Sequence, residues 1–113
     1  MMRSSLAALA VGALLALPSM AQAQDAKVKH GMEVFTAQHC SLCHAIAGKG
    51  NAKGALDEVG TKLKAEEIRE WITDAKGMTA KTKAARKPPM KQYTLPKDDV
   101  DALVAYLETL KKK

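Results

Sequence analysis

Two cysteines and a histidine at fixed spacing constrain this chain more than any other feature. Cys40 and Cys43 are its two cysteines, with two residues between them, and His44 follows directly. A disulfide closing so small a loop would constrain little of the unfolded chain. A thiol oxidoreductase would need a preceding strand in a βαβ unit, which the sequence does not indicate. A zinc site would need more cysteines, or histidines at ligand spacing, than His30 and His39 provide.

The run Cys-x-x-Cys-His is instead the attachment signature of c-type haem. In such a site each cysteine sulfur is bonded to one vinyl group of the porphyrin, and the histidine lies under the iron. Because only Ser41 and Leu42 intervene, both sulfurs can face one porphyrin edge while the histidine turns onto the proximal side. The motif therefore predicts one covalent haem c per chain, held by Cys40 and Cys43 with His44 as an iron ligand.

The first 23 residues have the pattern of a secretory signal peptide. Arg3 precedes an apolar run over residues 6–17, and the segment ends in the small-residue sequence Ala21-Gln22-Ala23, which is typical of a cleavage site. The alternative is a membrane anchor, but the apolar run is shorter than the roughly 20 residues that a spanning helix needs. We expect export to the periplasm, cleavage after Ala23 and a single domain over residues 24–113 with no remaining anchor.

A domain of this size is only marginally stable unless its core is reinforced. The aromatic residues available are Phe35, Trp71, Tyr93 and Tyr106, which would make a thin core for side chains alone. A large buried prosthetic group would supply the missing apolar contacts.

Hydrophobic periodicity predicts an all-α domain, because no stretch of the sequence has the pattern of a strand. In residues 26–39, Val28, Met32 and Phe35 recur at helical spacing. Gly31 lies on the same predicted face, where glycine disfavours the helix, so we expect another backbone or helix to approach closely there.

Two more helices are expected, over residues 64–75 and from about residue 96 to 110. Residues 47–60 are rich in glycine and read as a loop. Residues 75–93 carry six basic residues and no acidic one, and the pair Pro88-Pro89 favours an extended segment just before Met90.

Five stretches resemble the small class I cytochromes c of the bacterial periplasm, which carry one haem: GMEVFTAQHCSLCH, GALDEVGTKL, EEIREWI, KPPM and LVAYLETL. The resemblance extends over nearly all of residues 24–113. It implies the cytochrome c-like fold, in which crossed N- and C-terminal helices surround a covalently attached haem. It also implies that Gly31 and Phe35 meet Tyr106.

The same resemblance implies that a methionine after a proline-containing loop is the distal iron ligand. Met90 fits this description. Met78 lacks flanking prolines, and Met32 is expected to pack in the first helix. Relatives often have a proline after the loop glycine, and the carbonyl of that proline accepts a hydrogen bond from the proximal histidine. Here Gly54 is followed by Ala55, whose carbonyl would take that place.

His30 and His39 are expected to be exposed, because they lie on the side of the haem where the cysteines attach and could not readily reach the distal face. Trp71 either contacts a haem propionate or packs in the core, and the sequence leaves both possibilities open.

With His44 and Met90 on the iron, the protein would be an electron carrier and not an enzyme, moving one electron at a time. The alternatives are a haem subunit of a larger oxidoreductase complex, or an open-site haem enzyme or sensor if Met90 does not bind the iron. The net charge of +6 and the basic segment 75–93 predict redox partners that are acidic at the docking surface. We expect a monomer, and no nucleic acid partner for an exported protein.

Overall fold

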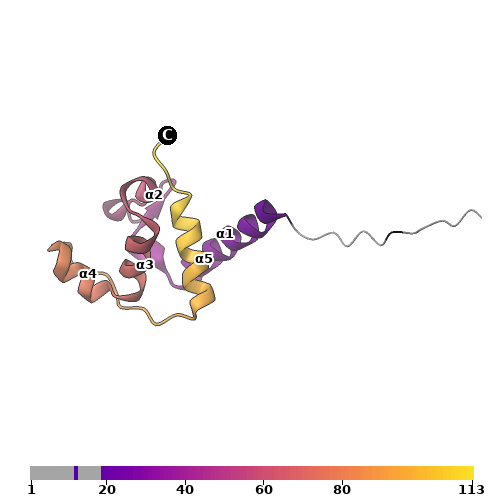
Figure 1. Ribbon diagram of the computed structural model, residues 1–113. Coiled ribbons are helices and arrows are strands. Elements are labelled where there is room, and N and C mark those ends of the chain that lie inside the picture. Colours follow the sequence, from indigo (N-terminus) through magenta and orange to yellow (C-terminus); the bar gives the residue numbers. More distant parts are fainter. Residues whose placement is uncertain (1–11, 13–18) are drawn as a thin grey trace, which may run out of the picture.

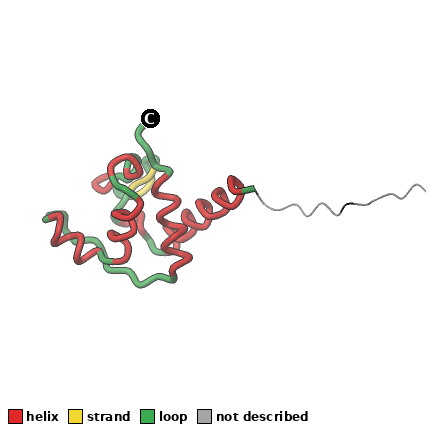
Figure 2. The backbone as a smooth tube through the Cα atoms, in the orientation of Figure 1, coloured by secondary structure: helices red, strands yellow, loops and turns green. Residues whose placement is uncertain are grey.

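The computed structural model describes Gly12 and residues 19–113. Most of the predicted signal peptide, residues 1–11 and 13–18, lies outside the described residues. Helices dominate the described part (Figures 1 and 2). The elements are α1 (Met20–Ala37), the 3₁₀ turn η1 (Cys40–Leu42), β1 (Ala45–Ile46), β2 (Lys49–Gly50), the 3₁₀ turn η2 (Ala52–Gly54), α2 (Val59–Lys62), α3 (Ala65–Thr73), α4 (Ala75–Thr82) and α5 (Lys97–Glu108). The all-α prediction is confirmed.

The strands form one short antiparallel hairpin, with Ala45 opposite Gly50 and Ile46 opposite Lys49. Its turn residues, Ala47 and Gly48, both have positive φ angles, of 51° and 78°, as a tight two-residue hairpin requires. The hairpin lies directly after His44 and folds the predicted loop back toward the cysteine turn.

Helices α1 and α5 cross and enclose the core together with α3 (Figure 1). The largest cluster of buried apolar side chains comes from these three helices, and its members are Val34, Phe35, Ile68, Ile72, Val100, Leu103, Val104 and Leu107. The rings of Phe35 and Tyr106 meet edge to face with their centroids 6.0 Å apart. The predicted meeting of the first and last helices is therefore confirmed.

Gly31 is the point of closest approach between α1 and α5. A Cβ atom placed there would collide with the backbone carbonyl of Ala102 and would lie 2.6 Å from Cβ of Tyr106. Only glycine lets the two backbones approach this closely, which confirms the reason predicted for a glycine on this helix.

The predicted apolar face of α1 is partly wrong. The buried residues of the helix are Gly31, Val34 and Phe35, whereas Met32 is 50% exposed. The helix is rotated so that its glycine faces α5, and this rotation turns Met32 toward solvent.

Helix α1 also begins at Met20, six residues before the predicted start at residue 26. Ser19 caps it, because its hydroxyl accepts a hydrogen bond from the backbone N–H of Gln22 and the Gln22 side chain accepts one from the N–H of Ser19. Residues 20–27 are exposed and form the projecting end of α1 in Figure 1. The helix therefore runs through the predicted cleavage site.

Helix α4 lies in the basic segment, for which the sequence predicts no helix. Asp74 caps its N-terminus by accepting from the N–H of Gly77 at 3.1 Å. Ala75 and Met78 of α4 are buried. In the described part of the chain, no helix is long and apolar enough to cross a membrane.

Candidate haem site

A cavity of about 510 Å³ opens between the cysteine turn, α2, α3, α5 and the segment around Met90. This volume is within the range of cofactor sites in proteins. Apolar side chains from segments far apart in the sequence line most of it, including Phe35, Leu56, Val59, Leu63, Ile68, Trp71, Ile72, Leu95, Leu103 and Leu107. The core described above is thus one wall of the cavity.

Both cysteines lie at one edge of this cavity. Cys40 begins the η1 turn and Cys43 directly follows it. The N–H groups of Cys43 and His44 both donate to the carbonyl of Cys40, at 3.1 and 2.9 Å. Cys40 is half-buried and Cys43 exposed, and both are free thiols. Burial raises the pKa of the Cys40 thiol, and a hydrogen bond with Tyr93 opposes that rise. Two unpaired thiols at one edge of an apolar cavity fit a group that is attached at two points.

His44 follows the turn and lines the same cavity. Its Nδ1 lies 2.9 Å from the backbone carbonyl oxygen of Gly54, so Nδ1–H is the donor and Nε2 keeps its lone pair. Burial, opposed by the Gly54 hydrogen bond, lowers the pKa of His44, and the positive charge of Arg86 lowers it further. A neutral imidazole with a free Nε2 is the form that binds a metal ion.

The carbonyl that accepts the hydrogen bond from His44 belongs to Gly54. The expectation that Ala55 would provide it is therefore wrong. Ala55 instead pairs with Ala45 in an isolated parallel bridge, and the N–H of Leu56 donates to the carbonyl of Ala45 at 2.8 Å. This pairing fixes the loop so that the carbonyl of Gly54, at the end of η2, faces the imidazole.

Met90 lines the cavity together with Pro88 and Pro89. Met78 is 5% exposed and packs in the core, but it is not among the cavity-lining residues, and Met32 lies on the outer surface of α1. Of the methionines in residues 19–113, Met90 is therefore the one that faces the cavity shared with His44.

The remaining predicted side chains lie either at the cavity or away from it. Trp71 lines the cavity. His39 is exposed, and His30 bonds to Asp99 with Nε2 and Oδ1 2.8 Å apart, away from the cavity. Across the described residues, no three side chains of His, Cys, Asp or Glu are grouped to hold a metal ion.

Two cavity residues, Arg86 and Tyr93, were not predicted. Arg86 is one of the six basic residues of segment 75–93, yet it is half-buried. Tyr93 lies beside Cys40 and lowers the pKa of its thiol, against the rise caused by burial. Neither belongs to a periodic element, so no local pattern shows that its side chain turns inward.

Comparison with known proteins agrees with this geometry. The family described as Cytochrome c matches residues 28–111. The chain belongs to the cytochrome c family. Membership implies haem c as the cofactor and haem-based electron transfer as the general function, in agreement with the paired thiols and the apolar cavity.

A curated relative of this cytochrome is the protein named cytochrome c oxidase subunit 2 from Alkalihalophilus pseudofirmus. It is 30% identical over 90 residues, which are 72% of this chain and 25% of the relative. The chain thus spans about a quarter of that protein. No solved structure matches this cytochrome.

Proposed function

We propose that this cytochrome is an exported electron carrier whose single haem c is attached through Cys40 and Cys43 and bound axially by His44 and Met90. One observation carries the proposal: the thiols and imidazole of residues 40–44 and the thioether of the distant Met90 all line one apolar cavity.

When bound, the haem supplies the iron that cycles between the ferric and ferrous states. The chain's part is to hold it, exclude water and set its potential. The Gly54 carbonyl fixes the His44 tautomer, and the Pro88-Pro89 pair presets the backbone that presents Met90. Methionine opposite histidine raises the reduction potential. If His44 and Met90 both bind the iron, a substrate would find no open position on it, which favours a carrier over an enzyme.

Export to the periplasm is part of the proposal and rests on the signal-like sequence of residues 1–23. The exposure of residues 20–27 supports it, because the described residues that cleavage after Ala23 would remove are all exposed.

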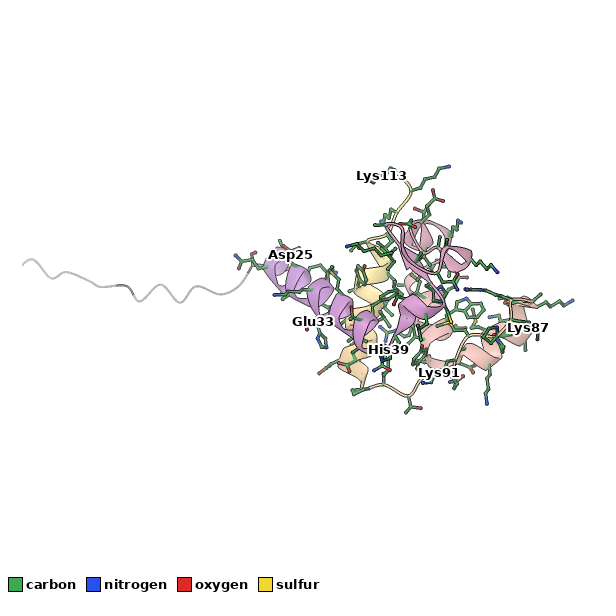
Figure 3. The ribbon with its side chains drawn as sticks, turned by 180° about the vertical axis from the view of Figure 1, so that it is seen from behind. Asp25, Glu33, His39, Lys87, Lys91 and Lys113 are labelled. Atoms are coloured by element: carbon green, nitrogen blue, oxygen red, sulfur yellow. The ribbon has the colours of Figure 1, made fainter. Side chains whose placement is uncertain are left out.

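The basic segment supports docking of an acidic redox partner near the haem. Lys87 and Lys91 are exposed and flank the cavity-lining residues 88–90. Figure 3 shows both side chains at the end of the molecule remote from Lys113. Lys91 also lies over the ring of Tyr93, with Nζ 5.5 Å from the ring centroid. Such a cationic rim would steer a negatively charged partner toward the cavity.

A second candidate is a haem subunit of a larger oxidase, which the relationship to an oxidase subunit favours. The two functions share the same haem site and differ in quaternary structure. A purified protein that sediments as a stable monomer supports the free carrier, and co-purification with oxidase subunits supports the alternative.

Absorption spectra of the purified protein test the haem site directly. We expect covalent haem c, a low-spin reduced spectrum and the weak far-red band of a sulfur–iron bond. Met90→Ala should keep the covalent haem, lose the far-red band, lower the potential and let the reduced form bind carbon monoxide. Met78→Ala is the matched control and should keep the band. Ready binding of carbon monoxide by the unmutated protein would favour the enzyme or sensor.

A further inference from the structure

Arg86 differs from the other basic residues of its segment. Lys76, Lys81, Lys83, Lys87 and Lys91 are exposed, whereas Arg86 is half-buried in the cavity wall. It forms no ion pair with any acidic side chain of the described residues. A guanidinium that is partly removed from water without a carboxylate partner is unfavourable unless its charge or its packing has another use.

The guanidinium of Arg86 packs against Gly54. A Cβ atom placed at Gly54 would collide with Nη1 of Arg86 and with the carbonyl of Cys43, and would lie 2.9 Å from Nδ1 of His44. The planar guanidinium thus occupies the space that a side chain at Gly54 would need. It lies beside the hydrogen bond that orients His44.

The contact between Arg86 and Gly54 connects two loops that are far apart in the sequence. Arg86 belongs to the loop that continues through Pro88 and Pro89 to Met90, whereas Gly54 belongs to η2 and serves His44. One side chain therefore joins the loops that carry the two proposed iron ligands.

We propose that Arg86 is a positioning residue that holds the Met90 loop against Gly54 and, through its charge beside His44, raises the reduction potential of the haem. This inference rests on the proposed haem ligation. Ferric haem carries one more positive charge than ferrous haem, so a nearby cation destabilises the ferric form more. Because Arg86 is half-buried and its guanidinium packs against Gly54, solvent screens this effect less than it would at the surface.

The test compares reduction potentials of the haem-loaded protein with those of three variants. Arg86→Gln removes the charge, Arg86→Lys keeps the charge but loses the planar fork, and Lys53→Gln removes an exposed charge next to Gly54. For Arg86→Gln we expect the equilibrium with a reference couple to shift roughly tenfold toward the ferric form, about 59 mV for one electron. Lys53→Gln should stay close to the parent.

Arg86→Lys separates charge from packing. We expect a potential near that of the parent, together with increased binding of carbon monoxide by the reduced form, because the Met90 loop is held less firmly. The inference is overturned if Arg86→Gln shifts the potential no more than Lys53→Gln does, or if Arg86→Lys lowers the potential without affecting carbon monoxide binding. Failure of the haem ligation itself would show separately, in the spectrum of the unmutated protein.

Discussion

At Gly31, a single missing methyl group decides how closely two helices cross. The atoms that a Cβ would meet are the carbonyl of Ala102 and Cβ of Tyr106, which belong to the backbone and the root of a side chain. Neither can move aside as the far end of a flexible side chain could. The glycine therefore favours the crossing geometry despite its poor helix propensity.

We expect Gly31→Ala to lower the free energy of unfolding by about 1–2 kcal/mol, because overpacking costs more than the helix gains from alanine. Denaturant unfolding of the haem-loaded protein measures this loss. Met32→Ala is the control on the same helix, and its effect should stay within about 0.5 kcal/mol because that side chain is half-exposed. An unchanged or raised stability of Gly31→Ala would show that α1 can move away from α5 without cost.

Between elements, His30 joins α1 to the first turn of α5. Its Nε2 lies 2.8 Å from Oδ1 of Asp99, and its Nδ1 lies 3.6 Å from Oε2 of Glu33 on its own helix. The hydrogen bond to Asp99, and to a smaller extent the contact with Glu33, raise the pKa of His30 above its ordinary value of 6.5 despite some desolvation. The folded protein thus holds the proton more tightly than the unfolded chain.

The raised pKa of His30 determines how the stability of the protein changes with pH. The stabilisation from protonated His30 is fully present below pH 6.5 and is lost as the pH rises through the raised folded-state pKa. We expect His30→Gln to remove this part of the dependence when the unfolding midpoint of the haem-loaded protein is measured between pH 5 and pH 8. His39→Gln, which changes an exposed histidine outside the pair, should leave the profile unchanged. A parent and a His30→Gln variant with parallel profiles would contradict the assignment.

The basic segment 75–93 carries the proposed docking surface, and its charge can be tested with an anionic oxidant. We expect oxidation of the reduced protein by ferricyanide to slow as salt is added, because screening shortens to about 8 Å at physiological ionic strength. Reversing Lys87 and Lys91 to Glu should slow the reaction at low salt and flatten its salt dependence.

Reversing Lys112 and Lys113 to Glu gives the matched control. It makes the same change in net charge, at the chain end that lies far from Lys87 and Lys91 (Figure 3). Equal slowing by both double variants would show that only the net charge matters, and not a surface near the cavity.

At the scale of the whole molecule, the cavity explains how a chain with so few aromatic residues can have a stable fold. The cavity is partly open to solvent and its walls are mostly apolar, so without a bound group this apolar surface would face water, which is unfavourable. A bound haem would cover that surface and complete the core.

Replacing Cys40 and Cys43 together by Ala should therefore abolish covalent haem and leave the chain largely unfolded. A denaturing gel stained for haem and far-ultraviolet circular dichroism measure the two effects. Ser41→Ala, between the two cysteines, is the control and should keep both haem and helicity. Cooperative unfolding of the double variant without haem would contradict a structural role for the cofactor.

The sequence alone predicted the features that depend only on residues close together in the chain. The haem motif could be read because its spacing is itself the chemical requirement. The helices α3 and α5 could be read because each has a regular apolar stripe. Helix α4 was missed because its lysines hide a short buried side made of Ala75 and Met78.

Only the tertiary structure decided which side chains reach the cavity. The prolines before Met90 already favoured it over Met78 in the sequence, but only the structure shows that α4 buries Met78 away from the cavity. Gly54, and not Ala55, meets His44 because the hairpin fixes the loop between them. Arg86 turns inward while neighbouring lysines stay in water. Each outcome depends on contacts between segments far apart in the sequence, which no local pattern of residues encodes.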